Sequence, residues 1–100
     1  MKKIVGNLLY DTETAEIVLT IMNSEYYGSF DIMVTKNDNW FVYGNVELTS
    51  HFEEAKIRWL RSACKQLSVL RTHTEAISLI LSCGEENMGL VLDRFHIHEA

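Results

Sequence analysis

The stretch FDIMVTKNDNWFVYG, residues 30 to 44, predicts the centre of the fold. Large apolar residues alternate with their neighbours from Phe30 to Thr35, which is the period of two expected for a strand with one buried face. Lys-Asn-Asp-Asn at residues 36 to 39 is a tight-turn sequence, because Asn and Asp tolerate positive φ. Trp40 to Tyr43 supplies the returning strand. The stretch is therefore predicted to be a β-hairpin.

The preceding sequence, LLYDTETAEIV at residues 8 to 18, predicts a second hairpin. Residues 4 to 10 are mainly apolar, and apolar residues alternate again from Ala15 to Met22. Between the two runs, Asp11 can accept a backbone hydrogen bond from two residues further on, which is an Asx turn. We therefore expect four antiparallel strands, in two hairpins, within residues 1 to 45.

The second half predicts two helices within residues 50 to 84. Ser and Glu stand three residues apart in SHFE, residues 50 to 53, and Thr and Glu do so in THTE, residues 72 to 75. Both spacings are capping boxes. From Phe52 to Leu70 apolar residues recur on one helical face. Charged residues line the opposite face: Glu54, Arg58, Arg61 and Lys65. Gly84 is a helix stop.

The C-terminal sequence MGLVLDRFHIH, residues 88 to 98, is predicted to be a closing strand. The expected fold is a single α+β domain over residues 1 to 100, with a four-stranded antiparallel sheet of two hairpins, a two-helix hairpin packed on it and this C-terminal strand. No apolar run approaches the roughly 20 residues that span a bilayer. We therefore expect a cytoplasmic protein without a membrane partner.

Histidine and cysteine positions suggest a zinc site. His96 and His98, at i and i+2 of the expected strand, would point to one side and could share a metal ion. A strand of about 26 Å running back along a helix of about 16 Å would carry them towards His73 and Cys64. The alternative is two solvated histidines, with Cys64 and Cys83 as small buried apolar residues.

Two surfaces are candidates for partner binding. Tyr26 and Tyr27 lie in a predicted loop, and tyrosine is enriched at protein interfaces. Arg58, Arg61 and Lys65 would share one helical face that could contact phosphates or acidic protein, or serve solubility alone. The net charge of -5 opposes direct DNA binding. No nucleotide-binding loop, nucleophile elbow or zinc-protease motif is present, so we expect no enzyme.

Three stretches, LYDTETAEIV at residues 9 to 18, TKNDNWFVYG at 35 to 44 and FEEAKIRWL at 52 to 60, resemble a known pattern in the same order. It belongs to a family of very small proteins from phages, prophages and mobile elements of Gram-positive bacteria. This chain departs from the pattern at Asp38, where the family's turn has glycine, and in the forty or so residues that follow the third stretch. The resemblance implies no catalytic residues.

The family's occurrence in phages and mobile elements implies a function, because small phage proteins often inhibit a host defence. The expected activity is stoichiometric inhibition of a host protein complex, a CRISPR effector nuclease, by blocking target-DNA loading in the bacterial cytoplasm. Tyr26 and Tyr27, or the face of Arg58, Arg61 and Lys65, would grip the partner. The alternative is a nucleic-acid-associated phage regulator that uses the same basic face.

Overall fold

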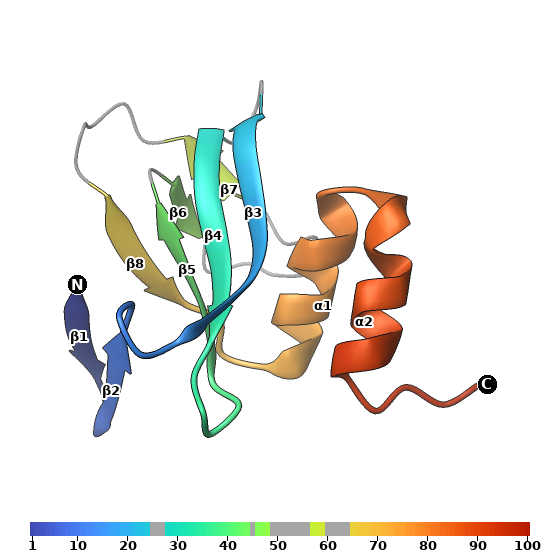
Figure 1. Ribbon diagram of the computed structural model, residues 1–100, viewed down its shortest axis with the longest axis horizontal. Coiled ribbons are helices and arrows are strands. Elements are labelled where there is room, and N and C mark those ends of the chain that lie inside the picture. The colour runs from blue at the N-terminus through green and yellow to red at the C-terminus, as the bar shows by residue number, and fades with distance from the viewer. Residues whose placement is uncertain (25–27, 45, 49–56, 60–64) are drawn as a thin grey trace.

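The computed structural model describes residues 1–24, 28–44, 46–48, 57–59 and 65–100. Within these residues the fold is α+β, with a four-stranded antiparallel sheet in the order β3-β4-β5-β8, two further strand pairs and two α-helices (Figure 1). The strands are β1 (Lys2–Val5), β2 (Leu8–Asp11), β3 (Glu16–Ser24), β4 (Gly28–Val34), β5 (Trp40–Gly44), β6 (Val46–Leu48), β7 (Ile57–Trp59) and β8 (Gln66–Val69). The helices are α1 (His73–Ser82), the short 3-10 helix η1 (Glu85–Asn87) and α2 (Met88–Arg94).

The central hairpin is confirmed. Strands β4 and β5 pair in a register that runs from Phe30 opposite Gly44 to Val34 opposite Trp40. In the turn between them Asp38 has a φ of 64°. This left-handed conformation is one that Asp and Asn adopt more readily than most side chains do. The strand expected from Ala15 to Met22 is confirmed as β3, and it pairs with β4.

The N-terminal prediction is partly wrong. Residues 4 to 10 do not form one strand, because Gly6, with a φ of 64°, turns the chain and lets β1 pair with β2. Asp11 forms the expected Asx turn, its Oδ1 accepting a 3.0 Å hydrogen bond from the Glu13 amide. This turn leads from the small β1–β2 hairpin into β3 and so does not close a hairpin. Gly-Asn between two apolar runs is itself a hairpin signal.

The predicted helix over residues 50 to 70 is wrong wherever the structure describes it. Residues 49–56 and 60–64 lie outside the described part, but Ile57–Trp59 is strand β7 and Gln66–Val69 is strand β8. Strand β8 pairs with β5 and completes the sheet. Pairing with β5 satisfies backbone groups that an edge would leave open, and such tertiary pairing overrides a local helical pattern.

The helix starting at THTE is confirmed as α1. Thr72 caps it by accepting a 3.1 Å hydrogen bond from the Glu75 amide, and Oε2 of Glu75 accepts one of 2.6 Å from the Arg71 amide. Gly84, at φ 152°, follows its last turn. The closing strand over residues 88 to 98 is wrong, since Met88–Arg94 is helix α2.

The two helices cover one face of the sheet (Figure 1). Alternate residues of β4 and β5 face the helices. They form one core with buried residues of both helices and of the chain next to β8 and α2. The buried members of this core are Phe30, Ile32, Val34, Trp40, Val42, Leu70, Ala76, Leu79, Ile80, Val91 and Phe95. The opposite face carries a smaller cluster of Tyr10, Met33, Phe41 and Leu67. The β1–β2 hairpin therefore packs on the sheet face away from the helices, through Tyr10.

Candidate functional site

Of the predicted partner-binding residues, the structure describes Arg58 and Lys65. Tyr26, Tyr27 and Arg61 lie outside the described residues. Arg58 is part of strand β7, so the helical face that was to carry the basic stripe is wrong at this position. Lys65 is exposed just before β8, where its Nζ lies 5.4 Å from the ring centre of Tyr43.

The predicted metal ligands are partly brought together. His73 is the first residue of α1, and His96 lies in the tail after α2; both line one pocket. His98 is exposed two residues further along this tail, and no strand aligns it with His96. Cys64 lies outside the described residues. Among the residues that the structure describes, no group of three His, Cys, Asp or Glu side chains is placed to hold a metal.

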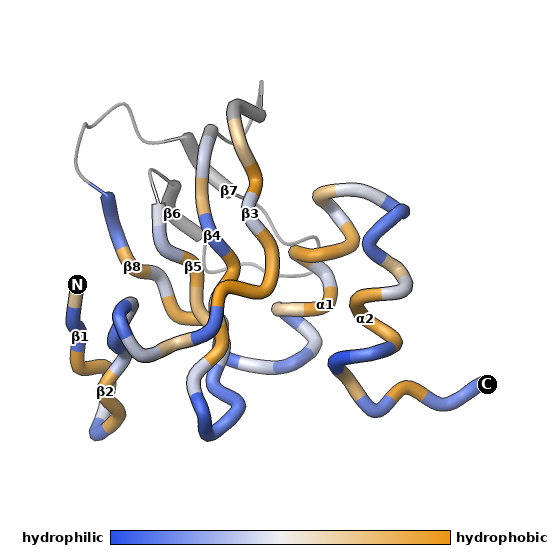
Figure 2. The backbone as a smooth tube through the Cα atoms, in the orientation of Figure 1, coloured by the Kyte–Doolittle hydropathy of each residue, from blue (hydrophilic) through white to orange (hydrophobic). Residues whose placement is uncertain are grey.

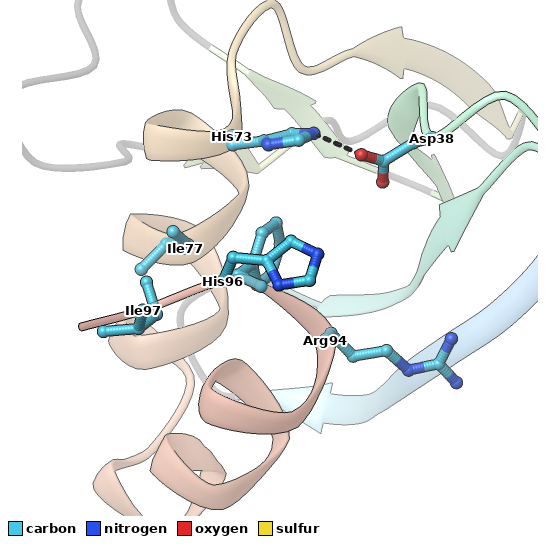
Figure 3. Close-up of a pocket in the computed structure, with 7 residues that line it drawn as sticks. Asp38, His73, Ile77, Arg94, His96 and Ile97 are labelled. Carbon is cyan, nitrogen blue, oxygen red and sulfur yellow. Dashed lines mark ion pairs between the residues drawn. The ribbon is translucent and has the colours of Figure 1, made fainter.

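The pocket that contains both histidines has a volume of about 400 Å³ and lies where three segments meet (Figure 3). The β4–β5 turn contributes Asp38, α1 contributes His73 and Ile77, and the chain after α2 contributes Phe95 and His96. Phe95, one of these lining residues, packs on other aromatic rings.

Phe95 fixes the start of the C-terminal tail against two rings. It stacks on Trp40 with ring centres 4.8 Å apart, and its centre lies 5.4 Å from that of the His73 ring in an edge contact.

Asp38 makes two polar side-chain contacts at this pocket. Its Oδ1 accepts a 2.9 Å hydrogen bond from Nε1 of Trp40, and its Oδ2 lies 2.8 Å from Nε2 of His73. Both carboxylate oxygens are thus engaged. The turn conformation at Asp38 therefore fixes the β4–β5 turn to the indole of β5 and to the N-terminal end of α1.

Arg94 lines the pocket but pairs outside it. Figure 3 shows its side chain extending away from His73 and Asp38. The guanidinium pairs with the carboxylate of Glu16 at the start of β3. This hydrogen bond lowers the pKa of Glu16 and raises the pKa of Arg94. The pair ties the end of α2 to the edge strand.

The chemistry available in the pocket is limited. The side chains that line it provide imidazoles, a carboxylate and a guanidinium, with neither a hydroxyl nor a thiol among the lining residues that the structure describes. Nucleophiles of the Ser, Thr or Cys type, which an adjacent base activates, are therefore not among these lining residues. The free thiol of Cys83 packs against the helix-side core, and burial raises its pKa, which keeps it in the weakly nucleophilic protonated form.

A second feature, which the sequence pattern had not indicated as a site, is the apolar end of the β1–β2 hairpin. We call Ile4, Val5, Leu8 and Leu9 the hairpin tip. Their exposed fractions are 72%, 37%, 44% and 57%. Figure 2 shows apolar colouring on the β1–β2 hairpin, which lies at the margin of the molecule on the side opposite α2. Large aliphatic residues grouped in this way are typical of an interaction surface.

No protein-family model, curated protein or solved structure matches this chain. In the described part of the chain, none of the helices has the length and apolar character needed to span a membrane.

Proposed function

We propose that the protein acts by stoichiometric binding to another protein, with the hairpin tip as its main contact. The observation that carries this proposal is the exposure of four neighbouring aliphatic side chains on one short hairpin. Grouped exposed aliphatic residues of this kind often mark a functional site on a monomer. A standard interface needs about 800 Å² from each partner, so surface around the tip would also take part.

We further propose that the partner is a host defence complex, a CRISPR RNA-guided nuclease, and that binding blocks the loading of target DNA. The support is the resemblance of three sequence stretches to small proteins of phages and mobile elements. The chain has 14 acidic residues against nine basic ones, and the acids are spread over both halves. A mimic of DNA would concentrate them, so inhibition by gripping the nuclease fits this chain better than occupation of its DNA channel.

The alternative, a nucleic-acid-associated regulator, depended on a helical basic face. Arg58 lies in strand β7, so it is not part of a helical basic face. Nothing in the described residues favours this alternative over binding to protein.

DNA cleavage by a panel of Gram-positive RNA-guided nucleases tests the proposal. The protein is added in increasing molar ratio, either before or after target DNA. We expect inhibition that saturates near one equivalent and is strong only when the protein is added first. Absence of inhibition across the panel at tenfold excess would remove the nuclease as the target. Equal inhibition in both orders of addition would remove the blocked-loading step.

A further inference from the structure

The hairpin tip is apolar on both of its faces. Residues that lie opposite each other in an antiparallel pair share a face, and residues two apart along a strand do so too. Ile4 lies opposite Leu9, and Val5 lies opposite Leu8. The tip therefore presents one aliphatic pair on each side of a two-stranded ribbon.

The root of the hairpin shows which face is which. Lys3 lies opposite Tyr10 and so shares the face of Val5 and Leu8. Nζ of Lys3 donates a 3.0 Å hydrogen bond to the carbonyl of Leu67 in β8. Tyr10 is buried against Phe41 of β5 in an edge contact with ring centres 5.6 Å apart. This inner face covers the sheet at its root, while Ile4 and Leu9 form the outer face.

Val5 and Leu8 remain 37% and 44% exposed although they lie on the inner face. The ribbon must therefore extend past the surface that Lys3 and Tyr10 cover, which leaves its turn end open on both sides. Figure 1 shows the β1–β2 hairpin at the margin of the molecule, with its turn directed away from the sheet.

The root also holds the ribbon in one position. The N-terminal amine of Met1 donates a 2.8 Å hydrogen bond to Oγ1 of Thr12, and the Thr12 amide donates one of 3.0 Å to the Met1 carbonyl. A two-stranded hairpin alone is marginally stable, so these contacts and the buried Tyr10 preorganise the tip. Preorganisation lowers the entropic cost of binding.

We propose that the hairpin tip is a wedge that inserts between two walls of a concave apolar cleft on a partner protein. This inference rests on the proposed binding function and specifies the shape and chemistry of the partner. A flat partner would cover either Ile4 and Leu9 or Val5 and Leu8 and leave the other pair in water. A cleft with apolar walls about 10 Å from each side of the ribbon, the spacing of stacked sheets, removes all four from water.

Two other occupants fit the tip less well. A second copy would bring one convex tip against another, which covers one face of each and provides much less than the roughly 800 Å² per partner of a stable interface. A membrane surface is favoured by interfacial Trp and Tyr, and residues 4 to 9 contain neither. The net charge of -5 also opposes binding to anionic lipid.

Photo-crosslinking from each face tests the wedge. Ile4, on the outer face, or Leu8, on the inner face, is replaced by benzoylphenylalanine in the full chain. Leu92, which is exposed on α2 at the other side of the molecule, serves as the matched control. Each protein is irradiated with the purified nucleases of the panel and with Gram-positive lysate. Thermal melts first show that each competitor is folded. The competitors, which carry no crosslinker and are added to reduce crosslinking, are wild type, Ile4→Ser/Leu9→Ser, Val5→Ser/Leu8→Ser and Leu92→Ser.

We expect positions 4 and 8 to crosslink to the same partner and position 92 not to do so. Each double variant should compete at least about tenfold more weakly than wild type, as expected for residues at an interface centre, whereas Leu92→Ser should compete like wild type. If both positions crosslink to one protein that is not a nuclease, and cleavage is not inhibited, the wedge proposal stands and the proposed nuclease target is refuted.

Several results would overturn the wedge. One is crosslinking from a single face, or loss of competition in only one double variant, even where cleavage is inhibited. Others are an adduct of twice the 11.5 kDa chain, which indicates a second copy, or yields at positions 4 and 8 no greater than at position 92. Sedimentation of wild type with phosphatidylglycerol–phosphatidylethanolamine vesicles, abolished by either double variant, would assign the tip to membranes instead.

Discussion

Nε2 of His73 lies 2.8 Å from Oδ2 of Asp38, so one side-chain contact joins the first residue of α1 to the turn between β4 and β5. The same carboxylate accepts the indole hydrogen bond of the buried Trp40. Asp38 thus connects the hairpin at the centre of the sheet to the helix that covers it. Because Asp38 also has a positive φ, one residue combines a turn conformation with two side-chain contacts.

Substitutions at Asp38 should separate these roles. Asp38→Asn keeps an amide oxygen for Trp40 and a side chain that tolerates positive φ, so it should cost about 0–1 kcal/mol, as expected for an exposed ion pair. Asp38→Gly keeps the turn but leaves the indole N–H without this acceptor, which should add about 1–3 kcal/mol. Urea unfolding measures both, and His73→Gln tests the ion pair from its other side. Equal stability of the Asn and Gly variants would contradict the role assigned to the indole bond.

The Glu16–Arg94 pair predicts acid sensitivity. Arg94 lowers the pKa of Glu16 in the folded protein, so the pair stabilises fully above the unfolded-state pKa of this carboxyl. Its contribution is lost as the pH falls through the folded-state pKa. Wild type should therefore lose stability more steeply below about pH 4.5 than Arg94→Gln does. Thermal melts from pH 7 to pH 3 measure this, with Lys36→Gln, in the exposed β4–β5 turn, as the control. Parallel curves for wild type and Arg94→Gln would contradict it.

The parts of the fold that the sequence predicts correctly are those with strong local signals. The turn at Asp38 and the capping box at Thr72 define their elements within a few residues, and both are confirmed. Strand β8 could not be predicted in this way, because its stability comes from pairing with β5, which is distant in the sequence. The sequence of helix α2 predicts a strand, although Val91 and Phe95, which are four residues apart and both buried, also fit a helical pattern.

In the candidate sites too, local sequence signals indicate residues correctly but do not indicate contacts between distant segments. The residue type of His73 and His96 suggested a shared site, and they do line one pocket, although the strand that was to bring them together is a helix followed by a tail. The contact between His73 and Asp38 has no local signal, since it depends on how α1 meets the turn. The sequence pattern does not indicate the hairpin tip, because the Gly6 turn lies inside an apolar run that predicts a single strand.

A zinc ion bound by His73, His96 and His98, with Cys64 as a fourth ligand, remains a prediction. Within the part of the chain that the structure describes no such group is assembled, so binding would require the tail after Phe95 to close towards His73. We expect near one equivalent of zinc in tag-free protein by elemental analysis, and less in His73→Gln and His96→Gln. His51→Gln, which changes the histidine that the prediction does not use, is the control. Zinc well below one equivalent in wild type would refute the site.

Two glycines should respond in opposite directions to alanine. Gly44, at the end of β5, lies opposite Phe30, and a Cβ there would lie 2.6 Å from the Phe30 Cα and 2.6 Å from the Ser29 carbonyl oxygen. These are backbone atoms of the paired strand, so relief requires β4 and β5 to separate. Gly44→Ala should therefore destabilise by about 1–3 kcal/mol, the usual cost of overpacking.

Gly89 lies in α2, and apart from its chain neighbours and the backbone of its own helix, a Cβ there would meet no atom within 4 Å. Gly89→Ala should stabilise by about 0.5–1 kcal/mol, because alanine loses less backbone entropy in a helix. Urea unfolding of both variants beside wild type measures the two shifts. A stabilising Gly44→Ala would mean that β4 and β5 do not approach as closely as their register indicates. A destabilising Gly89→Ala would mean that this position is not an open site in a helix.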